Sequence, residues 1–226
     1  MADKKPKFTN ITTPPGVAIY PKLNAPDTKF NANGAYSTRV KFSAEEAQPI
    51  IDKYETELAK YFEEVKAELM QGDGKSKAKA KSLKLAPDKP YKADFDDEGN
   101  ETGDLVLNFK MPAKVVREGK PDLIMKPDIF DAAGKKLLNP PEIWGGSKLI
   151  IAAQFRPFNT AIGVGLSLRL NAVQIVELST RGSRDSESYG FGAQEGGYEA
   201  SDEATSAPAA AEPGTTTADD DGSGDF

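Results

Sequence analysis

Two stretches near the end of the folded region, 147–158 and 163–178, carry the side chains best suited to binding chemistry. Side chains alternate between the two faces of a strand, so Arg156 and Phe158 share the outer face of the first stretch and Arg169 lies outward on the second. An aromatic ring can stack on a nucleobase, and a guanidinium can neutralise a phosphate or stack on a base itself. One base–ring stack contributes about 1–3 kcal/mol. This composition is typical of a surface that binds single-stranded nucleic acid.

Further cations and rings extend this candidate surface. Trp144 and Tyr36 are the candidates for a second stacking ring, although a single tryptophan more often packs in a core. The other cations fall on the expected outer faces of earlier strands. The complete candidate set for nucleic-acid contact is Phe158, Arg156, Lys148, Arg169, Trp144, Tyr36, Arg39, Lys41, Lys110, Tyr20 and Lys22.

These residues also have a simpler interpretation. Outward Arg and Lys side chains are a common way for a sheet to stay in solution with its edges unpaired. Pro157 perturbs the alternation, so Phe158 could instead tuck under a loop. Composition alone leaves both a nucleic-acid surface and an ordinary solvated sheet open.

A lysine-rich segment adds more positive charge in the middle of the chain. Its lysines are Lys75, Lys77, Lys79, Lys81 and Lys84. Glycines precede the segment at 72 and 74, so a flexible cationic loop is predicted, which would add diffuse attraction for a polyanion. A solvated surface loop without that role is the alternative.

Several kinds of catalysis are excluded by composition. The chain has no His and no Cys, which removes the usual zinc ligands, histidine general bases and thiol nucleophiles. Neither a phosphate-binding loop nor a dinucleotide-binding glycine run occurs. Carboxylates with magnesium remain possible, but no convincing catalytic set is present. The sequence therefore predicts a protein that is not an enzyme and has no cofactor and no metal site.

These residues must be positioned by a mainly β body with one long helix. Ser43 and Glu46 form a capping box, and apolar residues at spacings of three and four predict a helix over 44–70. In the first strand, Val17, Ile19 and Leu23 are expected to alternate with outward Tyr20 and Lys22. Strands are predicted at 17–23, 36–42, 91–95, 104–111, 147–158 and 163–178, with one or two more within 113–130.

This inventory fits an oligonucleotide-binding (OB) barrel of five to six strands with one long inserted helix. A β-sandwich fits the strand count nearly as well. Three regions are expected: a flexible arm at 1–16, the barrel domain at 17–181 and a disordered tail at 182–226. No apolar leader and no stretch of 18 apolar residues occurs, so we expect a cytoplasmic protein that does not contact membranes.

The tail is strongly acidic. It holds eleven Asp and Glu against Arg184 alone, a charge of −10; the whole chain is −6, so residues 1–181 carry +4. Low apolar content prevents it from folding by itself. A basic body joined to an acidic tail suggests a polyanion-binding protein that carries its own competitor. A tail that only improves solubility, ending by chance in Phe226, is the alternative.

The C-terminal half also resembles a known family. The resemblance is carried by Gly145-Gly146-Ser147-Lys148-Leu149, by Arg156-Pro157-Phe158-Asn159-Thr160-Ala161-Ile162-Gly163-Val164, by Val173-Gln174-Ile175-Val176-Glu177-Leu178 and by the ending Gly224-Asp225-Phe226. These segments resemble the single-stranded DNA-binding proteins of tailed bacteriophages, of the podovirus replisome type. Over 1–135 only the order of the elements agrees.

The resemblance implies an OB-fold body that binds single-stranded DNA without sequence preference during replication, recombination and repair. Phe158 would be its stacking aromatic, although this sequence lacks a further aromatic that the family pattern has beside it. The resemblance also implies that the tail contacts the polymerase and the primase-helicase and competes with DNA. The tail residues implied in partner binding are Asp219, Asp220, Asp221, Asp225 and Phe226.

We therefore predict a non-enzymatic phage protein that binds single-stranded DNA in the host cytoplasm. Whether it forms a homodimer is left open. The alternative is a β-rich structural or assembly protein of a phage or bacterium, and a metal-dependent nuclease is a distant third.

Overall fold

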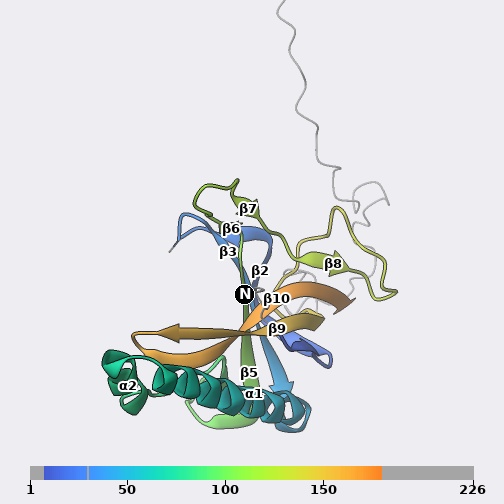
Figure 1. The fold of residues 1–226 in the computed structure, drawn as a ribbon. Helices are drawn as coiled ribbons and strands as arrows, with labels where there is room; N and C mark the ends of the chain where they lie inside the picture. Colours follow the sequence, from blue (N-terminus) through green and yellow to red (C-terminus); the bar gives the residue numbers. More distant parts are fainter. Residues whose placement is uncertain (1–7, 30, 180–226) are drawn as a thin grey trace, which may run out of the picture. The chain divides into compact units, whose positions relative to one another are not determined.

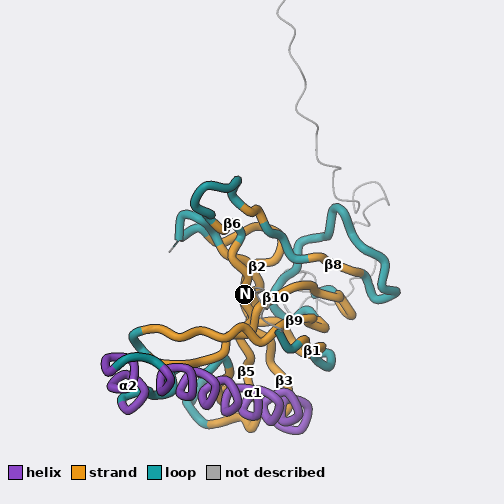
Figure 2. The backbone as a smooth tube through the Cα atoms, viewed as in Figure 1, coloured by secondary structure: helices purple, strands orange, loops and turns teal. Residues whose placement is uncertain are grey.

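The computed structural model describes residues 8–29 and 31–179 (Figure 1). Its elements are β1 (Asn10–Thr12), β2 (Gly16–Asp27), β3 (Ala35–Ser43), α1 (Ala44–Gln71), α2 (Gly74–Lys81), β4 (Tyr91–Phe95), β5 (Glu101–Pro112), β6 (Lys114–Val115), β7 (Leu123–Ile124), β8 (Asp128–Phe130), β9 (Lys148–Thr160) and β10 (Gly163–Glu177). Figure 2 shows the strands gathered together, with the two helices along one side of them. Among the described residues, no helix has the length and apolar character to cross a membrane.

Five strands close on one another as a barrel. β2 pairs with β3, β3 with β5, β5 with β10, β10 with β9, and β9 again with β2. The β5–β10 pair is parallel and the other four are antiparallel. A five-stranded Greek-key barrel of this kind is the OB fold. The predicted fold class is therefore confirmed, and the β-sandwich alternative is wrong. β1, β4 and β8 add to β9, β5 and β10 outside the ring.

The interior of the barrel is filled by alternate residues of β9 and β10, as the sequence predicted. Leu149 and Ile151 on β9, and Val164 and Leu170 on β10, are fully buried. The alternate residues, among them Arg156 and Arg169, lie on the opposite face, as expected for a strand with one buried face. The outer face that the sequence assigned to Arg156 and Arg169 is therefore the outer face of the barrel.

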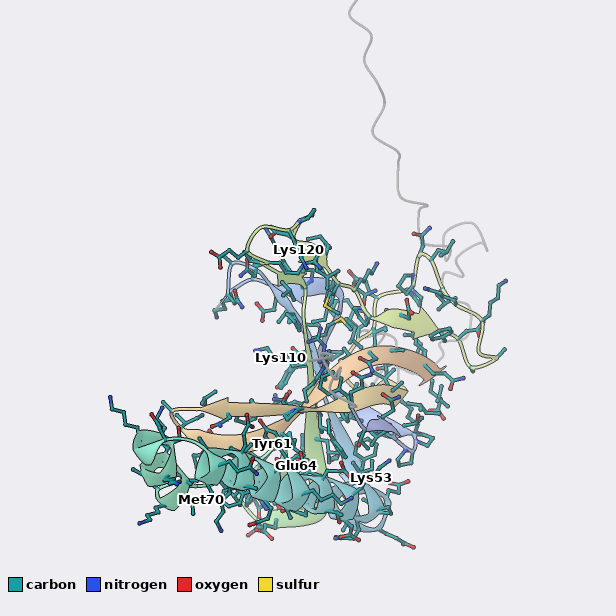
Figure 3. All side chains as sticks on the ribbon, viewed as in Figure 1. Lys53, Tyr61, Glu64, Met70, Lys110 and Lys120 are labelled. Atoms are coloured by element: carbon teal, nitrogen blue, oxygen red, sulfur yellow. The ribbon has the colours of Figure 1, made fainter. Side chains whose placement is uncertain are left out.

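Helix α1 covers one side of the barrel and begins as predicted. The Ser43 side chain accepts a hydrogen bond from the Glu46 backbone N–H, and the Glu46 carboxylate accepts one from the Ser43 N–H. Tyr54 anchors the helix, since its hydroxyl donates to the Leu166 carbonyl at 3.1 Å and its ring meets Phe155 edge-on. In Figure 3, Tyr61 lies between α1 and the β9–β10 hairpin.

Strand β2 differs from the predicted alternation. Ala18 rather than Val17 or Ile19 faces the core, with 1% of its surface exposed. The register shifts between Ile19 and Lys22, which returns Leu23 to the core. Tyr20 lies at this bulge with φ of 47°, an unusual conformation for a bulky residue.

The predicted flexible arm at 1–16 is partly a strand. β1 pairs antiparallel with β9, with Ile11 opposite Ala153. Ile11 and Thr13 are buried, and the Thr13 hydroxyl accepts a hydrogen bond from the Ile151 N–H at 2.9 Å. Residues 8–13 therefore belong to the folded body, because the Ile11 side chain is buried and their backbone is hydrogen-bonded to β9.

The lysine-rich segment is a helix and not the predicted loop. Asp73 caps α2 by accepting from the Ser76 N–H at 2.8 Å. Ala80 is the buried residue of α2. After the helix, Leu85 forms a short parallel bridge with Val164 of β10. Lys75, Lys77, Lys79 and Lys81 alternate along α2 and therefore fall on two opposite sides of the helix rather than on one cationic face, and Lys84 lies beyond its end.

Candidate nucleic-acid interface

A continuous row of residues crosses the outer face of the barrel. Gln154 on β9 lies opposite Arg169 on β10, and Arg169 lies opposite Lys110 on β5. Lys110 in turn faces Ser37 on β3, and Ser37 faces Lys22 on β2. Adjacent strands are about 4.8 Å apart, so the row brings together cations from distant parts of the sequence. Figure 3 shows Lys110 between the α1 side of the barrel and the β6–β7 arm, which carries Lys120.

Arg156 joins this row from the next outward position of β9, opposite Ser167. Burial lowers the pKa of Arg169, and the charge of Arg156 lowers it further, so the two guanidinium groups act on each other. Arg156, Arg169 and Lys110 form no ion pair with any described carboxylate. We call these three residues the outer-face cation cluster. Uncompensated like charges at close range favour the binding of a polyanion.

Phe158 follows Arg156 at the next outward position of β9. Its backbone partner on β10 is Gly165, and a β-carbon added at Gly165 would overlap the Phe158 ring. The ring therefore occupies the space that a side chain would fill on β10. Phe158 is half-buried. Its placement suits a ring that stacks on a base.

Two rings stack on cations at opposite ends of the same face. The guanidinium carbon of Arg39 lies 5.3 Å from the centre of the Tyr20 ring, and 76% of the Tyr20 surface is exposed. At the other end, the guanidinium carbon of Arg156 lies 3.8 Å from the centre of the Phe8 ring. Sequence reasoning missed Phe8, because only the pairing of β1 with β9 brings it to this face.

Four of the predicted contact residues are buried, paired with a carboxylate or set in a turn away from the outer-face cation cluster. Tyr36 lies in the core with 7% exposure, so its ring cannot stack on a base. Lys41 is neutralised by Asp94 at 3.3 Å and Asp104 at 3.8 Å.

Lys148 forms an ion pair with Glu177 at 3.0 Å. Lys148 lies eight residues along β9 from Arg156, which is a distance of roughly 26 Å at the usual strand rise. Trp144 is half-buried in a turn whose backbone is hydrogen-bonded to β2 through Ala18. Neither residue lies beside the cluster.

Among the described residues, no group of three or more acidic, His or Cys side chains could hold a metal ion. The site consists of cations and aromatic rings on the outer face of the barrel. Fold and surface together define an OB-type barrel with a cationic outer face.

Comparisons with known proteins identify the family. The family model described as "Single-stranded DNA-binding protein, Bacteriophage T7" matches residues 16–178. The chain is 31% identical to the single-stranded DNA-binding protein of Escherichia phage T7 over 178 residues, covering 76% of this chain and 73% of that protein. It is 34% identical to the corresponding protein of Enterobacteria phage T3 over 119 residues, half of each chain.

Solved structures agree with this assignment. The crystal structure of gp2.5 from bacteriophage T7, a single-stranded DNA-binding protein, covers 86% of this chain and all of its own, with 27% identity and a TM-score of 0.60. The fold is also shared with the single-stranded DNA-binding protein of bacteriophage Enc34 in complex with ssDNA, at 17% identity and a TM-score of 0.51; that match covers 76% of this chain and 88% of the Enc34 protein. The chain belongs to the family of the T7 single-stranded DNA-binding protein, which is not a family of enzymes.

Proposed function

We propose that this protein binds single-stranded DNA without sequence preference across the outer face of its barrel. The observation that carries the proposal is the outer-face cation cluster, Arg156, Arg169 and Lys110, which has no described carboxylate partner. Family membership supports the proposal, since the T7 and T3 relatives are named single-stranded DNA-binding proteins.

The arrangement separates two tasks. The cluster neutralises phosphates along the row, while Phe158 and Tyr20 offer ring faces to bases. Stacking accepts any base because every base has a π-face, so this mode of binding needs no hydrogen bonds to base edges. A duplex keeps its bases stacked inside, and the rings then have nothing to stack on. Preference for single strands follows from this difference.

We also propose that the protein serves phage DNA replication, recombination and repair in the host cytoplasm. Its acidic tail would contact the polymerase and the primase-helicase and compete with DNA for the body. The tail residues Asp219, Asp220, Asp221, Asp225 and Phe226 lie outside the described residues. Support for the tail's role comes from charge, since a −10 segment is joined to a body of +4. Self-association as a homodimer is compatible with this role.

Binding can be tested by fluorescence polarisation with labelled oligo-dT and its duplex. We expect clear preference for the single strand, and affinity that falls with salt at about 0.7 log units per phosphate contact. Lys110→Ala should weaken binding and reduce the salt slope by about 0.7. Lys66→Ala is a matched control, because Lys66 is an exposed lysine of α1 that pairs with Glu63 at 3.9 Å.

Binding of neither DNA form would contradict the proposal and favour the alternative, a structural or assembly protein. If Lys110→Ala binds DNA as tightly as Lys66→Ala does, DNA does not bind across the outer face. Cleavage of the oligonucleotide on addition of magnesium would instead indicate a nuclease.

A further inference from the structure

Phe8 is held in a fixed place by the edge strand β1. Asn10 pairs with Gln154 on β9, and the Phe155 N–H donates to the Thr9 carbonyl at 3.0 Å. Continuing this antiparallel register sets Phe8 opposite Arg156, on the outer face. The Thr9 hydroxyl also donates to Glu57 of α1 at 3.1 Å, which fastens the backbone beside the ring.

The ring is the main partner that the structure shows for the Arg156 guanidinium. The guanidinium carbon lies 3.8 Å from the ring centre, closer than in the Arg39–Tyr20 pair at 5.3 Å. The Arg156 Nε is buried and has no hydrogen-bond partner among the described residues. Within the described part of the chain, stacking on Phe8 is therefore the interaction that orients this guanidinium.

We propose that Phe8 is a positioning residue for DNA binding. By stacking on Arg156, it holds the guanidinium beside Arg169 in the conformation that meets a phosphate or a base. An arginine that is already ordered loses less freedom when DNA binds, so the contact gains affinity. The inference rests on the proposed function and extends its surface to β1, a strand outside the barrel ring.

A purely structural role for Phe8 makes a different prediction. The ring also lines a cavity of about 330 Å³ with Tyr61, Pro157 and Leu166. If Phe8 only packs against the body there, its removal should change DNA binding by the same factor whether or not Arg156 is present. If it acts through Arg156, the two substitutions should not be additive.

A double-mutant cycle separates these roles in the full-length chain. Phe8→Ala, Arg156→Ala and the double variant are compared by polarisation with labelled oligo-dT. We expect Phe8→Ala to weaken binding about five-fold, as for the loss of one cation–π contact. In the Arg156→Ala background the same change should have no effect. Phe8→Tyr should bind as the wild type does, and Phe8→Leu, which keeps apolar bulk without a ring, should bind as Phe8→Ala does.

Controls identify which idea fails. Phe95→Ala removes a phenylalanine that is 55% exposed on β4 and should not change DNA affinity. Thermal unfolding of each variant checks that the fold is retained. Equal effects of Phe8→Ala in both backgrounds, or full activity of Phe8→Leu, would overturn the positioning role while DNA binding itself stands. A wild-type chain that does not bind oligo-dT would overturn the proposed function and this inference together.

Discussion

At the scale of single residues, the outer face combines rings and cations in pairs. Phe8 with Arg156 and Tyr20 with Arg39 lie at opposite ends of the face, and Lys110 lies between them. Each guanidinium keeps N–H donors at its edge while its flat face covers a ring. Under the proposed function, the cations of this surface neutralise phosphates while its rings stack on bases, which suits DNA of any sequence.

Substitution of Gly165 tests where the Phe158 ring lies. A β-carbon in Gly165→Ala would overlap the ring, so the ring must leave its place. We expect a loss of about 1–3 kcal/mol in the free energy of unfolding, together with weaker binding of oligo-dT. Urea unfolding and fluorescence polarisation measure the two effects.

The control is Gly145→Ala, because the atoms nearest to a β-carbon at Gly145 lie 3.8 Å away. In a Phe158→Ala background, Gly165→Ala should no longer reduce stability, since no ring remains to be displaced. A loss of stability that persists there would mean that Phe158 does not lie on Gly165.

At the scale of elements, sequence patterns predicted those parts whose signals are local. The capping pair Ser43 and Glu46 and the long alternations of β9 and β10 were read correctly because each depends on neighbouring residues. β1 was missed because its short strand becomes stable only by pairing with β9, far away in the chain. The lysine-rich segment forms a helix where the sequence predicts a loop. The buried contact of Ala80, which helps to hold α2, is a tertiary contact that no local sequence pattern reveals.

The candidate site was predicted in part for the same reason. Alternation placed Arg156, Arg169 and Phe158 on one face. The contact of Phe8 with Arg156 depends on how β1 pairs with β9, and the exposure of Tyr20 depends on a register shift between β2 and β3. No local sequence pattern specifies either pairing. Tyr36 was proposed as a stacking ring although its own alternation with Val40 and Phe42 indicated the core, where all three lie.

The free energy of unfolding should fall at alkaline pH, because Tyr54 of α1 is buried. Burial raises the pKa of the Tyr54 hydroxyl from 10.0 to about 12. Because the folded-state pKa lies above the unfolded one, the stabilisation is complete below pH 10 and is lost as pH rises from 10 to about 12. The loss amounts to at most about 2–3 kcal/mol.

Urea unfolding below pH 10 and at about pH 12 measures this change. Tyr54→Phe cannot ionise and should show a smaller decline than the wild type. Some decline should remain in that variant, since burial also raises the pKa values of Tyr61 and Tyr91. Identical declines in wild type and variant would show that Tyr54 does not titrate as its burial implies.

At the scale of the whole molecule, charge is divided between a body of +4 and a tail of −10. If the tail competes with DNA, deletion of 182–226 should tighten binding of oligo-dT at low salt. Salt weakens tail binding as well as DNA binding, so the truncated protein should also show a steeper salt dependence. The two affinities should converge at high salt, where the charges are screened.

A matched control keeps the tail's length and removes its charge, by changing every tail Asp to Asn and every tail Glu to Gln. This variant should bind DNA as the truncated protein does. Equal low-salt affinity of all three proteins would contradict competition and leave the tail as a tether for partners.

The pairing of β1 and β2 with β9 has a consequence for how the protein is made. Ile11 and Gly16 find their partners, Ala153 and Leu149, at the far end of the body. During synthesis β1 and β2 therefore cannot pair with β9 until nearly all of the barrel has left the ribosome. Pairings between such distant residues make folding slow. The acidic tail follows β10 in the chain, so the barrel can close while the tail is still being added.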